Sequence, residues 1–320
     1  MFFKNRIGLG TSGWAWTPEA AVRQEGLMDK VLNLGYRMFD TAEQYSDGRV
    51  ETLLGNSITR SSIPRSEFEI VSKVLPNNAM DRNSFRDSLK KSLDRLQTDY
   101  VDSYLLHFFM EGVSIEKCAE WMAECQSEGT IRSVGCSNLK GRAIHEWRTF
   151  EEAENYPKEQ RLQVIQFRYG PKHRYPDQFY TEKGANGYER VVSWNTKFDA
   201  ELTGMPHSVF GGGRASGYQR PQQNPTESYR GDFWDMPELK QVEPIAESIG
   251  ATVPQFLIAY FNLRFPWAVS IPRSHKIPHL IDNLKAGEFV PKITNSIKEQ
   301  VDVIFPVPKM AQPGSYENRR

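Results

Sequence analysis

Four residues in the first third of the chain could together move a proton. Asp40 and Tyr45 lie in the stretch FDTAEQYSDGRVETLLG, Lys73 lies in EIVSKV, and His107 ends SYLLH. A phenol has an ordinary pKa of about 10 and is a poor acid at neutral pH, but a nearby ammonium is expected to lower that pKa. A carboxylate would hold the lysine charged and in place, and an imidazole could hydrogen-bond the oxygen that receives the proton. These residue types therefore predict a proton-donating cluster.

The elements that must position these residues alternate between short apolar strands and helices with a period of 3.6 residues. Eight strands are expected, over Arg6–Leu9, Tyr36–Asp40, Phe68–Lys73, Val101–His107, Ile131–Cys136, Leu162–Phe167, Arg190–Trp194 and Trp267–Ile271. Eight βα units favour a closed parallel barrel over an open sheet, and the carboxyl ends of barrel strands meet on one face. The expected fold class is α/β, a single (β/α)8 TIM-type barrel with a long loop after strand 7.

The opening stretch GLGTSGW has the spacing G-x-G-x-x-G, which is typical of a dinucleotide-binding Rossmann turn. In that turn the helix begins inside the glycine motif, so that free N–H groups face the pyrophosphate. Here the helix signals begin only at Thr17 and Pro18, and a proline excludes an established helix running through that point. The glycines are therefore expected to serve a tight turn at the mouth of the barrel.

The organisation expected is one barrel domain over residues 1–305 and a tail over residues 306–320. One stretch, about residues 204–235, breaks the alternation with glycines, prolines and many aromatic residues. A segment of this length in a compact domain is either a functional lid or a disordered insertion. We expect it to fold over the barrel as a lid.

Composition excludes several classes of function. The 40 basic residues equal the 40 acidic ones, so no basic face for nucleic acid is expected. No run of 18 uncharged apolar residues suggests a membrane span, and the amino-terminal residues do not resemble a secretory signal, so a cytoplasmic protein is expected. Cys118 and Cys125 are interpreted as buried small hydrophobes. His173, His207 and His275 show no ligand spacing, and no metal is expected.

Around the proton-donating cluster the chain resembles the aldo-keto reductase superfamily, over about residues 5–290. The motifs are Asp40-Thr41-Ala42 with Tyr45, Gly48, Glu51 and Leu54-Gly55, then SLKKSLDRLQTDYVDSYLLH, which ends at His107, and IRSVGCSN, which ends at Asn138. The resemblance implies an (α/β)8 barrel that binds a nicotinamide cofactor and passes a hydride to an aldehyde or ketone. By the same resemblance Tyr45 would be the general acid, and Asp40, Lys73 and His107 would complete a tetrad.

The resemblance also implies which residues hold the cofactor. Ser137, Asn138 and Gln166 would hold the carboxamide, and Trp194 would stack on the nicotinamide. In IPRSHKIPHLIDN, Arg273 and Ser274 would contact the 2′-phosphate of NADPH, and Asn283 would contact the adenine. His279 stands where the family usually has arginine, which leaves NADH open as the cofactor. Gly10 and Thr11, at the end of strand one, complete the expected cofactor contacts.

A small-molecule carbonyl compound is the expected partner of a monomer or weak oligomer. Trp14, Trp16, Phe108 and Phe109 fall at expected strand ends, where they would line a substrate pocket, although each could instead be a core residue. Such a pocket suits a bulky, partly apolar substrate. The alternative function is a regulatory subunit with little turnover, like the potassium-channel auxiliary subunits that share this fold.

Overall fold

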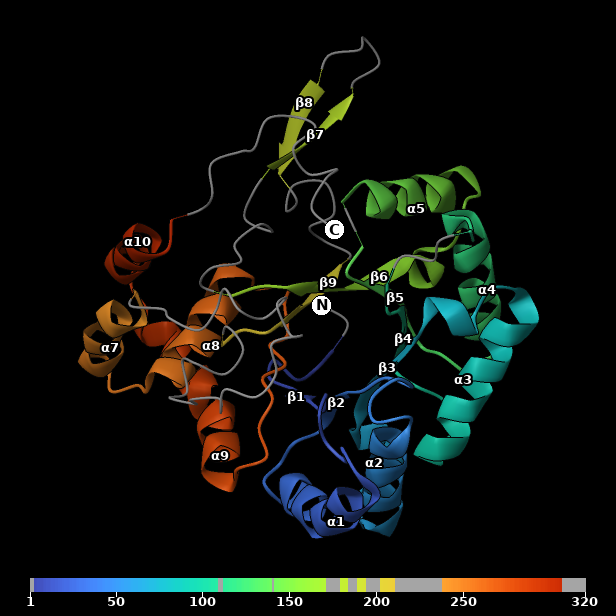
Figure 1. Cartoon of the computed structure of the whole chain (residues 1–320). Helices are drawn as coiled ribbons and strands as arrows, with labels where there is room; N and C mark the ends of the chain where they lie inside the picture. The colour runs from blue at the N-terminus through green and yellow to red at the C-terminus, as the bar shows by residue number, and fades with distance from the viewer. Residues whose placement is uncertain are drawn as a thin grey trace, which may run out of the picture. The chain divides into compact units, whose positions relative to one another are not determined.

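The computed structural model describes residues 3–108, 112–139, 141–170, 179–183, 189–193, 202–210 and 238–306. Seven parallel strands form its main sheet, in the order β1-β2-β3-β4-β5-β6-β9 (Figure 1). Their bounds are β1 Leu9–Gly10, β2 Met38–Asp40, β3 Glu69–Val74, β4 Ser103–Leu106, β5 Val134–Ser137, β6 Leu162–Arg168 and β9 Thr203–His207.

The segment 268–271 closes this sheet into a barrel. Gly204 in β9 forms a parallel bridge with Ala268, and the Val269 N–H donates to the Gly204 carbonyl at 2.7 Å. On the other side Ser270 forms a parallel bridge with Ile7, just before β1. The segment therefore acts as the eighth strand, and the expected (β/α)8 barrel is confirmed.

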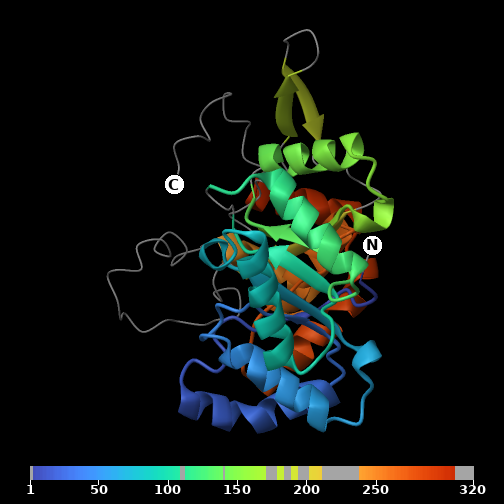
Figure 2. The ribbon, with the colours of Figure 1, turned by 90° about the vertical axis from the view of Figure 1, so that its right-hand side faces the viewer.

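Helices follow the first five strands in turn. They are α1 Pro18–Asn33, α2 Arg49–Arg60, α3 Arg82–Leu96, α4 Ile115–Ser127 and α5 Gly141–Ala153, with short 3₁₀ turns η1 Arg65–Glu67, η2 Pro76–Asn78 and η3 Lys158–Gln160. Each of the first four of these helices packs against the next along the chain, as the side view shows (Figure 2). No helix in the described ranges is long and apolar enough to cross a membrane.

The chain divides into two compact units. The first comprises Met1–Phe167, Leu202–His207 and Ala268–Leu284, and contains the barrel strands and most of α9 (Ile277–Lys285). The second comprises Arg168–Glu201, Ser208–Trp267 and Lys285–Arg320. Its elements are β7 Phe179–Lys183, β8 Glu189–Ser193, α7 Glu238–Ser248, α8 Val253–Arg264, η7 Ala286–Lys292 and α10 Asn295–Ile304.

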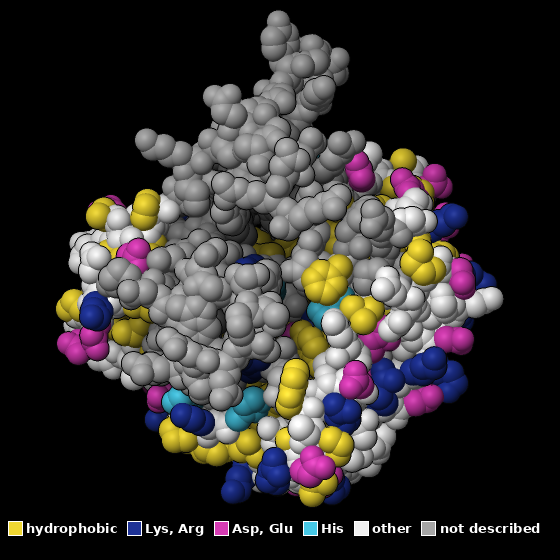
Figure 3. All heavy atoms as spheres, in the orientation of Figure 1, with side chains coloured by type: hydrophobic (Ala, Val, Ile, Leu, Met, Phe, Trp, Pro, Cys, Tyr) yellow, Lys and Arg dark blue, Asp and Glu magenta, His cyan; other side chains and the backbone are white. Residues whose placement is uncertain are grey.

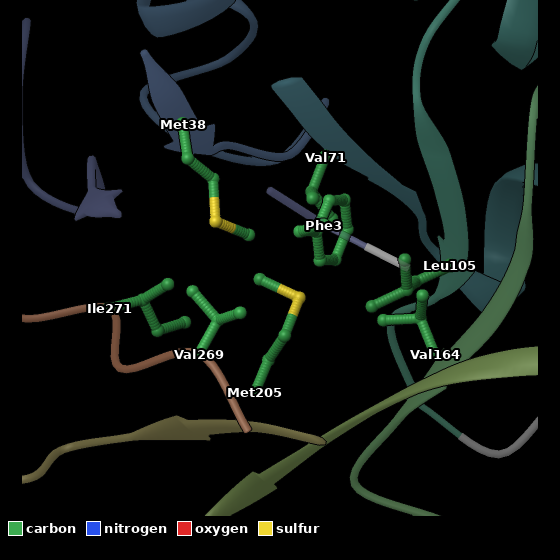
Figure 4. Close-up of a cluster of buried hydrophobic side chains, with 8 residues drawn as sticks. All are labelled: Phe3, Met38, Val71, Leu105, Val164, Met205, Val269 and Ile271. Carbon is green, nitrogen blue, oxygen red and sulfur yellow. The ribbon is translucent and has the colours of Figure 1, made fainter. Parts of the chain in front are cut away.

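Apolar side chains fill the interior of the barrel. Phe3, which precedes β1, lies among strand residues that point toward one another (Figure 4). The cluster comprises Phe3, Met38, Val71, Leu105, Val164, Met205, Val269 and Ile271. The Glu69 carboxylate at the start of β3 accepts hydrogen bonds from the backbone N–H groups of Lys4 and Asn5, at 2.5 and 3.1 Å. These bonds fix the segment that carries Phe3 at the amino-terminal end of the barrel.

The glycine stretch forms a turn and does not begin a helix. Residues 12–15 form turns, and α1 begins at Pro18 after the Thr17 hydroxyl accepts a bond from the Ala20 N–H. A Cβ at Gly10 would lie 2.8 Å from the Ile271 carbonyl oxygen, so this glycine lets β1 approach the eighth strand. Gly13 has a φ of +83°, which glycine adopts readily. The barrel interpretation of this motif is therefore confirmed over the Rossmann one.

The seventh strand is the one that the sequence prediction placed wrongly. Residues 189–193 do form a strand, β8, but it pairs antiparallel with β7 in a separate two-stranded sheet. The seventh barrel strand is β9, whose sequence TGMPH contains a glycine and a proline. Both residues are depleted in strands, and Pro206 has no N–H for the ladder. The strand that was expected to end at Trp194 is therefore not a barrel strand, and Trp194 itself lies outside the described residues.

The long loop after strand 7 begins later than expected. Of the segment 204–235, residues 204–207 belong to β9, and Val209 and Phe210 are buried. Residues 211–235, most of the expected lid, lie outside the described residues, as do residues 307–320 of the expected tail.

Candidate active site

Parallel pairing brings three of the four predicted catalytic residues to the carboxyl-terminal end of the barrel. Asp40 is the last residue of β2, Lys73 is the fifth of the six residues of β3, and His107 follows β4 directly. All three are buried, and Lys73 is 0% exposed. Tyr45 lies in the loop after β2 and is half-buried. Ser46 and Asp47 both have left-handed backbone conformations, which turn the chain sharply after Tyr45.

Lys73 is the centre of this cluster. Its Nζ lies 2.7 Å from Asp40 Oδ1 and donates hydrogen bonds to the Thr41 carbonyl at 2.6 Å and to the Tyr45 hydroxyl at 3.4 Å. Burial alone lowers the pKa of Lys73, but the Asp40 carboxylate and the Tyr45 hydroxyl raise it, and the net direction is upward. The lysine is therefore an ammonium held against the phenol.

The pKa of Tyr45 is raised and not lowered. Burial disfavours the phenolate and is the largest cause, Lys73 opposes it, and Asp40 adds to the rise. The expectation that the ammonium would bring the pKa below its ordinary value was wrong, because burial outweighs one cation whose charge Asp40 balances. The phenol accordingly keeps its proton at neutral pH.

His107 lies beside Tyr45 as a neutral imidazole. The two rings meet edge to face with centroids 5.7 Å apart. The ring of Phe108 stacks on the ring of His107, with centroids 4.7 Å apart. Burial, with the charge of Lys73 and the neighbouring His207, lowers the pKa of His107 to about 3. Its buried Nδ1 has no hydrogen-bond partner within the described part of the chain.

A cluster of amides and a hydroxyl lies next to these four residues, and it is formed by Ser137 at the end of β5, Asn138 directly after it, and Gln166 on β6. Gln166 Nε2 donates to Asp40 Oδ1 at 2.7 Å, and Ser137 Oγ donates to Gln166 Oε1 at 3.4 Å. Asn138 Nδ2 donates to Ser137 Oγ at 2.9 Å and to the His107 carbonyl at 3.1 Å. The three residues predicted to hold a carboxamide are thus brought together and joined to the predicted catalytic residues.

His207, the last residue of β9, belongs to the same network and was missed from the sequence. Its Nε2 lies 3.3 Å from Asn138 Oδ1. In the sequence His207 shows no metal-ligand spacing, and the strand that carries it has no clear strand pattern. The sequence does offer one signal. His207 ends a short apolar stretch and directly precedes Ser208, Val209 and a run of glycines.

The loop after β1 is fixed to the loop after β2. The Thr11 hydroxyl donates to the Asp40 carbonyl at 2.8 Å, and Ser46 Oγ donates to the Trp14 carbonyl at 2.7 Å. Trp14 is fully buried, and its ring lies 4.9 Å from that of His275. Trp16, by contrast, is 73% exposed.

The predicted phosphate-binding loop follows the eighth strand. Arg273 is exposed, and its Nη1 donates to the Ser12 carbonyl at 2.8 Å, which joins this loop to the loop after β1. Ser274 Oγ accepts from the Lys276 N–H at 3.1 Å, and His279 is half-buried. Asn283 is buried beside Tyr36.

Two of the aromatic residues predicted at the substrate pocket are exposed, Trp16 and Phe108, the latter at 44%. Hydrophobic and histidine side chains lie beside one another on the face shown in Figure 3. Phe109 lies outside the described residues.

Within the described ranges no three His, Cys, Asp or Glu residues are grouped as metal ligands.

Several known proteins are similar to this chain. A potassium-channel protein of Schizosaccharomyces pombe, described as a putative voltage-gated potassium channel subunit beta, is 28% identical over 295 residues, which are 87% of this chain and 83% of that protein. Methylglyoxal reductase DkgB of Salmonella typhi is 38% identical over 110 residues, only 34% of this chain and 40% of that protein.

Solved structures share the fold over nearly the whole chain. The thermostable aldo-keto reductase Tm1743, in complex with the inhibitor epalrestat, has a TM-score of 0.73 and 28% identity, covering 93% of this chain and 94% of that one. An aldo/keto reductase of Klebsiella pneumoniae, in complex with NADP and acetate, has a TM-score of 0.68 and 24% identity, covering 95% and 93%. A family model described as the Aldo/keto reductase family matches residues 6–303. The chain therefore belongs to the aldo/keto reductase family of oxidoreductases.

Proposed function

We propose that this protein is an NADPH-dependent reductase that transfers a hydride to an aldehyde or ketone, with Tyr45 as the general acid. The observation that carries the proposal is the chain of contacts from Asp40 through Lys73 to the Tyr45 hydroxyl, next to a neutral His107. This arrangement suits proton delivery to an oxygen on which negative charge develops.

The roles of the four residues follow from their charges. The raised pKa of Tyr45 keeps its proton available, and the proton moves to the carbonyl oxygen as the carbon accepts the hydride. The phenolate that remains is stabilised by the Lys73 ammonium, which Asp40 holds in place. His107, neutral, donates a hydrogen bond to the same carbonyl oxygen and orients the substrate. An alcohol is the product.

The donor set suits a nicotinamide dinucleotide phosphate. When bound, NADPH supplies the hydride. Ser137, Asn138 and Gln166 carry the amide and hydroxyl groups that a carboxamide requires, and Arg273 carries the guanidinium that suits a phosphate. Ser274, His279, Asn283, Gly10 and Thr11 are the further proposed contacts. The NADP complex of the Klebsiella pneumoniae protein supports this cofactor, and NADH remains the alternative.

The substrate that we propose is bulky and partly apolar. Trp16 and Phe108 are exposed on the loops after β1 and β4, where apolar surface gains most from being covered by a ligand. A small sugar would leave its hydroxyl groups unpaired against such side chains. The protein would act in the cytoplasm as a monomer or weak oligomer.

One comparison favours a second function. The Schizosaccharomyces pombe relative, matched over 87% of this chain, is described as a putative channel subunit. A regulatory protein that binds the cofactor with little turnover is therefore the alternative.

Loss of NADPH absorbance with a panel of aromatic and aliphatic aldehydes, ketones and free sugars tests the proposal. The reductase predicts turnover with the apolar carbonyl compounds, and loss of this turnover in a Tyr45→Phe variant. Cofactor binding without turnover across the panel would favour the regulatory function. Free sugars as the best substrates would contradict the proposed substrate class.

A further inference from the structure

The side chain of His207 on β9 reaches the cluster of amides and a hydroxyl that Ser137, Asn138 and Gln166 form. His207 ends the strand and is half-buried, and its Nε2 lies 3.3 Å from Asn138 Oδ1. His207 is also close enough to His107 to influence its charge. The carboxyl-terminal ends of strands β4, β5 and β9 thus meet at the side chain of Asn138.

The hydrogen bonds of Asn138 determine which way its amide faces. Both N–H groups of Nδ2 are used, one by the His107 carbonyl at 3.1 Å and one by Ser137 Oγ at 2.9 Å. If the amide were turned over, its oxygen would face the His107 carbonyl oxygen, and two acceptors would meet. Oδ1 is therefore the atom that faces His207, and His207 Nε2 must carry the proton of this bond.

Asn138 is held in an uncommon backbone conformation as well. Its φ is +59°, and its N–H donates to the Gln166 carbonyl at 3.0 Å. An amide oxygen can accept two hydrogen bonds, and His207 uses one of them. One acceptor position on Oδ1 remains for a ligand N–H. Its direction is defined by the bonds of the Asn138 side chain to His107, Ser137 and His207.

We propose that His207 is a positioning residue, whose Nε2–H holds the Asn138 amide in the orientation that accepts the carboxamide N–H of the cofactor. This proposal rests on the proposed function and names a residue that supports it. Asn138 would contact the cofactor, and His207 would act through Asn138.

Two substitutions separate the hydrogen bond from the aromatic ring. His207→Gln keeps an N–H donor at a similar reach and removes the ring, whereas His207→Phe keeps a ring and removes the donor. Because one neutral hydrogen bond contributes modestly, His207→Phe should raise the dissociation constant for NADPH roughly 5- to 10-fold, while His207→Gln should stay within about twofold of the parent. The KM for the carbonyl substrate should be unchanged in both.

Fluorescence titration with NADPH gives the dissociation constants, and His145→Gln on α5 is the matched control for loss of a histidine elsewhere. A double-mutant cycle of His207→Phe with Asn138→Ala should be strongly non-additive, since both changes remove the same bond. Retained binding in His207→Phe with loss in His207→Gln, equal effects of the two, or an additive cycle would each overturn the proposal.

The proposed function fails separately. If the parent protein does not bind NADPH or has no turnover with any carbonyl compound, the proposed reductase is wrong. If the parent binds and turns over while both His207 variants match it, only the role of His207 is wrong.

Discussion

A phenol that donates a proton must first hold it, and the environment of Tyr45 meets this requirement of its proposed role. Burial keeps the pKa of Tyr45 high, so the protonated form dominates before reaction. The Lys73 ammonium, 3.4 Å from the hydroxyl, interacts most strongly once the phenolate forms. In the proposed reaction the pair would therefore favour the charge that develops on Tyr45 over the charge present before it.

Replacement of Tyr45 tests its proposed role as the acid. Tyr45→Phe removes the transferable proton and little else, so kcat for carbonyl reduction should fall roughly a hundred- to ten-thousandfold, while the NADPH dissociation constant changes little. Single-turnover kinetics and fluorescence titration measure the two quantities. Comparable turnover in the variant would remove Tyr45 from the acid role.

Arg273 is expected to discriminate between the two nicotinamide cofactors. A guanidinium that meets the 2′-phosphate forms a charge-assisted pair of roughly 1.5–3 kcal/mol. Arg273→Met should therefore weaken NADPH binding by that amount and affect NADH, which lacks the phosphate, much less. Titrations with both cofactors measure the difference. Equal losses for the two cofactors would contradict a contact between Arg273 and the 2′-phosphate.

At the scale of elements, the packing of the helices determines where a glycine is required. α1 and α2 each contain one glycine in their interior, Gly26 and Gly55. A Cβ at Gly26 would meet nothing within 4 Å, whereas a Cβ at Gly55 would lie 2.5 Å from the Arg95 carbonyl oxygen at the end of α3. Only Gly55 is required by packing.

The same substitution should have opposite effects at these two positions. Gly26→Ala should stabilise the protein by up to about 1 kcal/mol, because alanine has the higher helix propensity. Gly55→Ala should destabilise it by about 1–3 kcal/mol, because α2 must move away from α3. Urea denaturation measures both free energies. A stabilised Gly55→Ala variant would contradict the packing between α2 and α3.

Elements also explain what the sequence could and could not predict. The strands that end at or next to Asp40, Lys73 and His107 are apolar runs flanked by clear helix signals. Their ends could therefore be located from the sequence alone. The run containing Val191 and Val192 has the same local pattern, yet β8 pairs in a hairpin. Strand propensity does not specify a partner.

β9 shows the converse. Its glycine and proline argue against a strand, and only the barrel around it makes the pairing favourable. His207 could not be placed in the site without that strand, because its contact with Asn138 joins residues 69 positions apart. The cluster of Asp40, Tyr45, Lys73 and His107 could be located from local motifs, whereas His207, which depends on tertiary pairing, could not.

At the scale of the whole molecule, stability depends on buried groups that titrate far from the site. Glu151 on α5 is 1% exposed, and its Oε1 accepts from Trp147 Nε1 at 2.8 Å and from the Leu162 N–H at 2.7 Å. Burial raises the pKa of Glu151 from 4.5 to about 7, against the opposing effects of these bonds and of Arg148. The folded protein therefore binds a proton that the unfolded chain releases between these two values.

The sign of the resulting pH dependence is definite. A folded-state pKa above the unfolded value contributes stability that is fully present below the unfolded pKa and is lost as the pH rises through the folded pKa. Glu151 should thus cost the native state up to roughly 3 kcal/mol as the pH rises from 4.5 to about 7. His107 acts in the opposite sense, because its pKa is lowered from 6.5 to about 3.

Glu151→Gln isolates the first contribution, since the amide oxygen keeps both accepted bonds and cannot ionise, and His107 is common to both proteins. The variant should match the parent at about pH 5 and exceed it in free energy of unfolding at about pH 8, by roughly 1–3 kcal/mol. Denaturation at both pH values measures the difference, with Glu152→Gln, an exposed neighbour on α5, as the control. A variant less stable than the parent at the higher pH would mean that the ionised carboxylate and Arg148, 3.6 Å apart, stabilise the barrel as an ion pair.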